Sequence, residues 1–169
     1  MVGRLDGRAI CWCVNIKGME EWSELEQLVT KRKFQGTSKR TNLNITDAPR
    51  YRHNNGSTFL VTRIMSDVVR EGPIFDQCVK MLGWTPEQIT SNKNIVCKPH
   101  VDRNKGQSAI AFVGEFTGGA LLVQEGDTIR RFDQPYTWYY YHGRDTHWNE
   151  EITSGTKYAV VCYRKRTYK

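Results

Sequence analysis

The sequence has no long apolar run. Across 169 residues, no stretch approaches the roughly 18 consecutive apolar residues that a membrane-spanning helix needs. Residues 1–17 also lack the apolar run and small-residue cleavage site of a secretory signal peptide. We therefore expect a soluble, intracellular protein with no membrane partner, and the sequence does not distinguish a nuclear, cytoplasmic or viral setting.

Cysteines are few and show no disulfide framework. The chain has five, an odd number, and only Cys11 and Cys13 lie close together. No second pair of Cys or His residues follows at the spacing of a zinc site. We therefore expect reduced thiols and interpret Cys11 and Cys13 as core residues, because free cysteine is among the most buried residue types.

The length and composition are those of one globular domain. With 38% hydrophobic and 25% charged residues, the chain can bury an ordinary core. We expect a single domain over residues 1–169, acting as a monomer. Helical support and a basic loop should occupy residues 1–93, and a β-rich core should occupy residues 94–166.

Positive charge is concentrated in one segment. The net charge is +7, and residues 31–52 carry +6 of it, because seven cations face the single acidic residue Asp47 there. Such a segment is typical of a polyanion-binding surface, although a solvated loop has the same composition. The cations are Lys31, Arg32, Lys33, Lys39, Arg40, Arg50 and Arg52.

Hydrophobic periodicity predicts helices before residue 94 and strands after it. In the first part, apolar residues at helical spacing begin at Met19, and Gly83 ends a second helical stripe. The N-terminal part is predicted to contain a strand (10–16), a helix (19–33), a long loop (34–57), a strand (59–65), a helix (74–82) and a helical turn (85–88). The later strands are predicted at 95–102, 108–114, 120–124, 128–132, 137–142 and 156–164. This pattern predicts a mainly β chain with flanking N-terminal helices (α+β), folded as a sandwich or jelly roll.

Candidate metal ligands stand at the end of one predicted strand and in the last strand pair. His100 and Asp102 are two residues apart, so on a strand they point to the same face. His142 and His147 both offer a third ligand. Two histidines and one carboxylate form the facial triad of non-haem iron(II) oxygenases, which leaves positions open for a chelating oxo acid and dioxygen.

Several motifs resemble the 2-oxoglutarate oxygenase superfamily. The runs are CKPHVDRN (97–104), GEFTGGAL (114–121), YHGRDTH (141–147) and GTKYA (155–159). The resemblance implies a double-stranded β-helix (jelly roll) and an iron(II)- and 2-oxoglutarate-dependent enzyme, with ascorbate as a candidate reductant. It also implies that His100, Asp102 and His147 bind the metal and carry catalysis, and it makes His142 a pocket residue.

The same resemblance assigns the 2-oxoglutarate site. Lys157 stands ten positions after His147, where the family places a basic residue that pairs with the far carboxylate of 2-oxoglutarate. The chain departs from the family in having Lys157 where arginine is usual and Ala159 where a hydroxyl commonly assists. Tyr163 and Arg144 are the candidates for an additional donor.

Within the superfamily, the motifs look most like the ten-eleven-translocation and J-base-binding-protein group. That resemblance implies hydroxylation of the methyl group of a 5-methylpyrimidine, such as 5-methylcytosine, in nucleic acid, with DNA preferred over RNA. The alternative is a protein or amino-acid side-chain hydroxylase of the prolyl type. Candidate substrate-binding residues are Lys39, Arg40, Arg50, Tyr51, Arg52, Asn104, Ser108 and His142.

Overall fold

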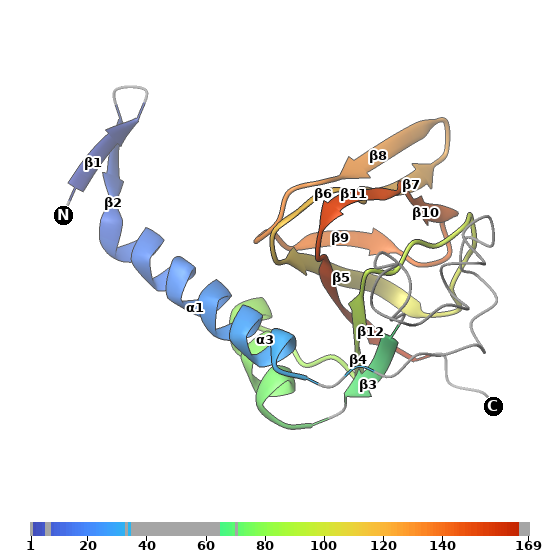
Figure 1. Cartoon of the computed structure of the whole chain (residues 1–169), viewed down its shortest axis with the longest axis horizontal. Helices are drawn as coiled ribbons and strands as arrows, with labels where there is room; N and C mark the ends of the chain where they lie inside the picture. The colour runs from blue at the N-terminus through green and yellow to red at the C-terminus, as the bar shows by residue number, and fades with distance from the viewer. Residues whose placement is uncertain (1, 6–7, 33, 35–64, 70, 166–169) are drawn as a thin grey trace.

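The computed structural model describes residues 2–5, 8–32, 34, 65–69 and 71–165 of the chain. In this part of the chain, antiparallel strands dominate and helices α1 and α3 accompany them (Figure 1). The predicted loop 34–57 falls outside the described residues apart from Phe34, and the predicted strand 59–65 falls outside them apart from Met65.

Helix α3 (Pro73–Leu82) begins and ends as its sequence predicts. Pro73 occupies the start of the helix, where a backbone N–H has no intrahelical partner. Gly83 adopts the left-handed conformation (φ 78°), and its N–H donates to the Val79 carbonyl at 2.9 Å. These two residues explain why the predicted helix is confirmed.

The N-terminal region differs from its prediction. Strands β1 (Val2–Leu5) and β2 (Arg8–Cys11) form an antiparallel hairpin, and helix α1 (Trp12–Thr30) follows directly. The strand predicted for 10–16 is therefore wrong beyond Cys11. A short apolar run fits a strand and a buried helix equally well, so periodicity alone does not separate them.

The main sheet has five antiparallel strands in the order β3-β4-β12-β5-β9. A three-stranded sheet in the order β10-β7-β8 and the pair β11-β6 complete the described strands. The main-sheet strands are β3 (Met65–Val69), β4 (Gln88–Lys93), β12 (Tyr158–Arg164), β5 (Lys105–Val113) and β9 (Tyr139–His142). The others are β10 (His147–Asn149), β7 (Leu121–Glu125), β8 (Thr128–Phe132), β11 (Ile152–Gly155) and β6 (Phe116–Gly118).

Each face of the main sheet packs against a different layer. Because side chains alternate along a strand, Ala109 and Val160 face the helices, whereas Ile110 and Phe112 face the second sheet. The helix side is completed by Leu25, Val29, Ile74, Cys78, Ile89 and Cys162, and the sheet side by Leu121, Val123, Phe132 and Tyr141. The predicted mainly β fold with flanking helices is confirmed.

Two local predictions are wrong. Residues 85–88 form no helical turn, because the chain enters β4 at Gln88. Residues 95–102 form no regular strand, and His100 makes only an isolated bridge.

Neither α1 nor α3, the helices of the described region, has the length and apolar character needed to cross a membrane.

Candidate metal centre and pocket

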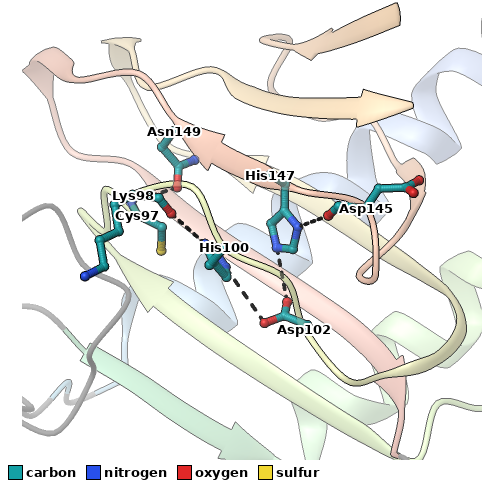
Figure 2. Close-up of polar contacts among 7 residues, drawn as sticks. All are labelled: Cys97, Lys98, His100, Asp102, Asp145, His147 and Asn149. Atoms are coloured by element: carbon teal, nitrogen blue, oxygen red, sulfur yellow. Dashed lines mark hydrogen bonds and ion pairs between the residues drawn. The ribbon is translucent and has the colours of Figure 1, made fainter. Parts of the chain in front are cut away.

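Two histidines face each other across an isolated antiparallel bridge. The His100 N–H donates to the His147 carbonyl at 3.1 Å, and the His147 N–H donates to the His100 carbonyl at 2.9 Å. His147 is the first residue of β10, which pairs with β7. The bridge places the imidazole rings side by side, with centroids 4.2 Å apart (Figure 2).

Asp102 completes a cluster of three candidate ligands. Its Oδ2 lies 3.2 Å from His147 Nε2, and its Oδ1 lies 3.8 Å from His100 Nε2. The Asp102 N–H donates to the Gly143 carbonyl at 2.7 Å. A Cβ atom on Gly143 would lie 3.1 Å from the Asp102 Cβ, so glycine permits this close approach. One ligand atom from each of the three residues lies within 4.8 Å of the others.

Backbone carbonyls orient both imidazole rings. His100 Nδ1 lies 2.7 Å from the Lys98 carbonyl, and His147 Nδ1 lies 2.8 Å from the Asp145 carbonyl (Figure 2). A carbonyl only accepts, so each Nδ1 is the donor, and a neutral ring would then turn an Nε2 lone pair toward Asp102. With both rings neutral, two nitrogen lone pairs and the Asp102 carboxylate would converge on one point. This donor set fits a divalent metal ion.

Asn149 connects the two ligand-bearing segments. Its side-chain Oδ1 accepts from the Cys97 backbone N–H at 3.1 Å, and the Asn149 backbone N–H donates to the Cys97 carbonyl at 3.0 Å (Figure 2). Asn149 lies two residues after His147, and Cys97 lies three residues before His100. Asn149 thus holds the irregular segment around His100 against β10, although that segment has no regular strand pairing.

The triad opens into a pocket of about 300 Å³ between the sheets. We call the part around His100, Asp102 and His147 the triad end, and the part around Lys157 the lysine end. At the triad end, the Tyr141 ring lies 5.3 Å from the His147 ring, and Tyr141 pairs with Ser108 on β5. The pocket lining also includes Thr90, Asn92, Ile95, Cys97, Asn104, Ile110, Phe112, Leu121, Asn149, Ala159, Val161 and Tyr163.

Lys157 is buried at the lysine end, where no acidic group of the described residues pairs with it. Its side chain is 3% exposed, its Nζ donates to the Gly119 carbonyl, and Nζ lies 4.1 Å from the centre of the Phe112 ring. Burial lowers the pKa of Lys157 to about 7. An anionic ligand would supply the missing counter-charge.

The backbone on both sides of Lys157 is fixed. The Lys157 N–H donates to Asn94 Oδ1 at 2.9 Å, and the Asn94 N–H donates to the Lys157 carbonyl at 2.8 Å. Asn94 has a φ of 54°, a conformation that asparagine tolerates better than most residues. Gly119 has a φ of 71°, and a Cβ there would lie 3.1 Å from Lys157 Cδ. Both positions therefore shape the lysine end.

The predicted site residues fall into three groups. His100, Asp102, His147, Lys157, Tyr163 and Asn104 line the pocket, as does the β12 face predicted to contain Ala159 and Val161. His142 and Arg144 are exposed and Ser108 is fully buried, and none of these three lines the pocket. Lys39, Arg40, Arg50, Tyr51 and Arg52 lie outside the described residues.

Several pocket residues were not predicted from the sequence. Tyr141, Asn92 and Asn149 line the pocket, and Asn94 anchors Lys157. Tyr141 is 3% exposed, and its burial, reinforced by the charge of Asp102, raises the pKa of its hydroxyl. Asn94 directly precedes the predicted strand 95–102, and an asparagine at such a boundary was the one usable signal.

Comparisons with known proteins give a structural likeness only. No protein-family model matches the chain, and no curated protein matches its sequence. The chain is similar to a prolyl-4-hydroxylase from Pseudomonas putida, with a TM-score of 0.53, 9% identity, and coverage of 90% of this chain and 88% of that one.

Two further solved structures are similar to the chain. One is NgTET1 in complex with 5mC DNA, with a TM-score of 0.45, 16% identity, and coverage of 90% and 69% of the two chains. The other is a 2OG-Fe(II) oxygenase family oxidoreductase from Burkholderia pseudomallei, with a TM-score of 0.43, 14% identity, and coverage of 78% and 62%. The likeness to the prolyl-4-hydroxylase confirms the predicted double-stranded β-helix fold.

Proposed function

We propose that this protein is an iron(II)- and 2-oxoglutarate-dependent oxygenase. The observation that carries the proposal is the pairing of two complementary ends in one pocket. His100, Asp102 and His147 converge acceptor atoms at one end, and Lys157 buries a lone cation at the other. A dicarboxylic oxo acid that chelates a metal with its oxo-acid end fits both.

Each residue has a definite task in this proposal. His100, Asp102 and His147 would hold iron(II) and leave coordination positions for the oxo acid and dioxygen. Lys157 would pair with the far carboxylate of 2-oxoglutarate. When bound, iron(II) and 2-oxoglutarate would supply the oxidising chemistry: 2-oxoglutarate would lose carbon dioxide and take one oxygen atom of dioxygen to become succinate, and the other oxygen atom would convert a substrate C–H group to C–OH.

The pocket walls would bind the co-substrate and limit water. Ile110, Phe112, Leu121 and Val161 line the pocket between its ends, and Ile110, Phe112 and Leu121 are buried. Apolar walls strengthen the attraction between Lys157 and a carboxylate, because few water molecules compete there. We therefore expect the binding of 2-oxoglutarate to depend on both the triad end and the lysine end.

Succinate production tests the enzyme class. Purified protein incubated with iron(II), 2-oxoglutarate and ascorbate should form succinate, measured by mass spectrometry, when a competent substrate is present. A panel of methylated oligonucleotides and proline-containing peptides should reveal the substrate as the member that gains oxygen. The Asp102→Ala variant should give neither product. Succinate levels in the wild type no higher than in Asp102→Ala across the panel would refute the proposal.

For the substrate, we propose the methyl group of a 5-methylpyrimidine in nucleic acid. The sequence motifs support this assignment, and so do exposed cations beside the ligand-bearing segments. Lys98, Arg103 and Lys105 flank His100 and Asp102, and Arg144 follows Gly143. No ion pair engages these four cations among the described residues. Unpaired cations around a pocket favour contact with phosphates.

Salt dependence separates nucleic acid from a peptide substrate. Binding of a methylated oligonucleotide should weaken with salt at a logarithmic slope of about −0.9 per phosphate contact for duplex DNA. The triple variant Arg103→Ser, Lys105→Ser, Arg144→Ser should reduce that slope by about two to three contacts. As a control, the same changes at Arg130, Arg131 and Lys80 should leave the slope intact. Equal slopes for wild type and the first variant, together with oxygen gain by a peptide, would favour the prolyl-type hydroxylase.

A further inference from the structure

Three residues on adjacent strands form a row beside Lys157. In the register of the main sheet, Ala159 on β12 pairs with Phe112 on β5 and with Asn92 on β4. All three side chains line the pocket. Lys157 lies two residues before Ala159 and lines the same pocket. The row therefore runs from an aromatic ring, across the small alanine, to a carboxamide.

The lysine ammonium lies above one side of this row. Lys157 Nζ is 4.1 Å from the Phe112 ring centre and donates to the Gly119 carbonyl. Neighbouring strands are about 4.8 Å apart, so Asn92 is about 10 Å from Phe112 along the row. Ala159, between them, has the smallest side chain of the three. The space above Ala159 is thus bordered by a cation on one side and an amide on the other.

We infer that Asn92 donates the second hydrogen bond to the far carboxylate of 2-oxoglutarate, above Ala159 and opposite Lys157. This inference rests on the proposed function. A buried carboxylate has two oxygens, and leaving one without a donor is costly. Lys157 already gives one of its three N–H groups to Gly119. A second donor from the opposite side of the row would satisfy the remaining oxygen.

The chemistry of an amide suits this position. Asn92 is 9% exposed, and its carboxamide offers two donors and an acceptor, so a protein contact at one group leaves capacity for a ligand. An acidic residue there would neutralise Lys157 before the co-substrate arrived. Asn149 also lines the pocket, but it lies two residues after His147 and is bonded to Cys97, in the segments that carry the triad. The row assigns the donor role to Asn92.

Calorimetric titration tests the inference without relying on turnover. With iron(II)-loaded protein under anaerobic conditions, Asn92→Ala should weaken 2-oxoglutarate binding by about 10-fold to 100-fold, as expected for a hydrogen bond to a charged group. Affinity for 2-oxobutyrate, which has the chelating end but no far carboxylate, should be unchanged. Ser91→Ala, on the same strand but outside the pocket lining, should bind both ligands like the wild type.

Rescue and charge reversal distinguish a specific contact from a structural effect. Adding Ala159→Ser to Asn92→Ala should restore part of the lost affinity, because a hydroxyl would then stand at the centre of the row. Asn92→Asp should weaken 2-oxoglutarate binding more than Asn92→Ala, because its carboxylate repels the ligand.

Two outcomes would contradict the inference in different ways. Wild-type protein that binds no 2-oxoglutarate would refute the proposed function and the inference together. Wild-type protein that binds it, with equal affinity in Asn92→Ala, would refute the role of Asn92 alone. An equal loss of 2-oxoglutarate and 2-oxobutyrate binding in Asn92→Ala would show a general disturbance of the pocket and would also overturn the inference.

Discussion

At the triad end of the pocket the protein gathers acceptor atoms, whereas at the lysine end it buries one cation among aromatic rings. The Asp102 side chain is 36% exposed, and both histidines are oriented by backbone carbonyls. Lys157 is 3% exposed, and within the described part of the chain its Nζ donates to the Gly119 carbonyl alone. The triad end is therefore organised by hydrogen bonds and open to solvent, and the lysine end is organised by burial.

This difference indicates which kind of ligand each end of the pocket should bind. Each end of the pocket presents groups that suit a different kind of ligand. A cation completes the triad end and an anion completes the lysine end. Loss of the Lys157 side chain should therefore leave metal binding at the triad end largely unaffected, whereas binding of 2-oxoglutarate should need both ends.

The largest effect is expected from removing a ligand at the triad end. Asp102→Ala or His147→Ala should lower metal affinity by more than about 100-fold, because even residues that only orient ligands typically contribute 10-fold to 100-fold. Metal content after dialysis checks this result. His142→Ala is the matched control and should keep the metal, because His142 is exposed and outside the pocket lining. Loss of metal in His142→Ala with retention in His147→Ala would reverse the assignment.

The lysine end should fail separately from the triad end. Lys157→Met should weaken 2-oxoglutarate binding by roughly 100-fold to 4000-fold, since breaking a buried ion pair typically costs about 3–5 kcal/mol. Metal content should stay at the wild-type level. Lys157→Arg keeps the charge and should bind 2-oxoglutarate far better than Lys157→Met. Calorimetry of the three proteins checks the order, and equal affinity in wild type and Lys157→Met would remove this residue from the site.

The buried lysine should also make the stability of the ligand-free protein depend on pH. Burial lowers the pKa of Lys157 from 10.5 to about 7, so between these values the unfolded chain binds more protons than the folded one. The free energy of unfolding should therefore rise with pH from about 7 to about 10, by on the order of 3 kcal/mol. Urea denaturation across this range should show a steeper rise for wild type than for Lys157→Met. Parallel curves would contradict a lowered pKa for Lys157 in the folded protein.

The smallest effect on metal affinity is expected where Asn149 connects the His147 segment to the His100 segment. Asn149→Ala removes the acceptor for the Cys97 N–H and loosens the segment that carries His100. Metal affinity should fall by about 10-fold, the lower range for residues that orient ligands. Asn149→Asp keeps the acceptor oxygen and should lose less. If both variants bind metal like the wild type, the backbone bridge between His100 and His147 is sufficient by itself.

The triad end was more predictable from sequence than the lysine end. His100, Asp102 and His147 stand in recognisable motifs, and the structure brings them together. The partners of Lys157 come from distant segments, since the Gly119 carbonyl and the Asn94 side chain reach it only after the sheets pair. A contact to a backbone carbonyl cannot be inferred from the amino-acid sequence, because every residue has a backbone carbonyl. Motif reading therefore finds ligands more easily than the groups that hold them.

Strands were predictable where one face is apolar. Strand β8 has the predicted bounds Thr128–Phe132, and the alternation in β12 places Ala159 and Tyr163 on the pocket side as expected. Strand β4 (Gln88–Lys93) was missed because its pocket face carries Thr90 and Asn92. A strand that lines a polar pocket loses the apolar alternation on which sequence interpretation depends.

The bridge between His100 and His147 has a consequence for how the fold is held closed. It joins an irregular segment to a short strand by a single pair of backbone hydrogen bonds, and both bridged residues are candidate ligands. A metal ion bound to both side chains would act as a cross-link that spans the 46 residues between them. Cross-links stabilise mainly by restricting the unfolded chain, and more so for longer loops. Chelation should therefore lower the melting temperature as well as the activity, and protein that folds without metal should open first at this seam.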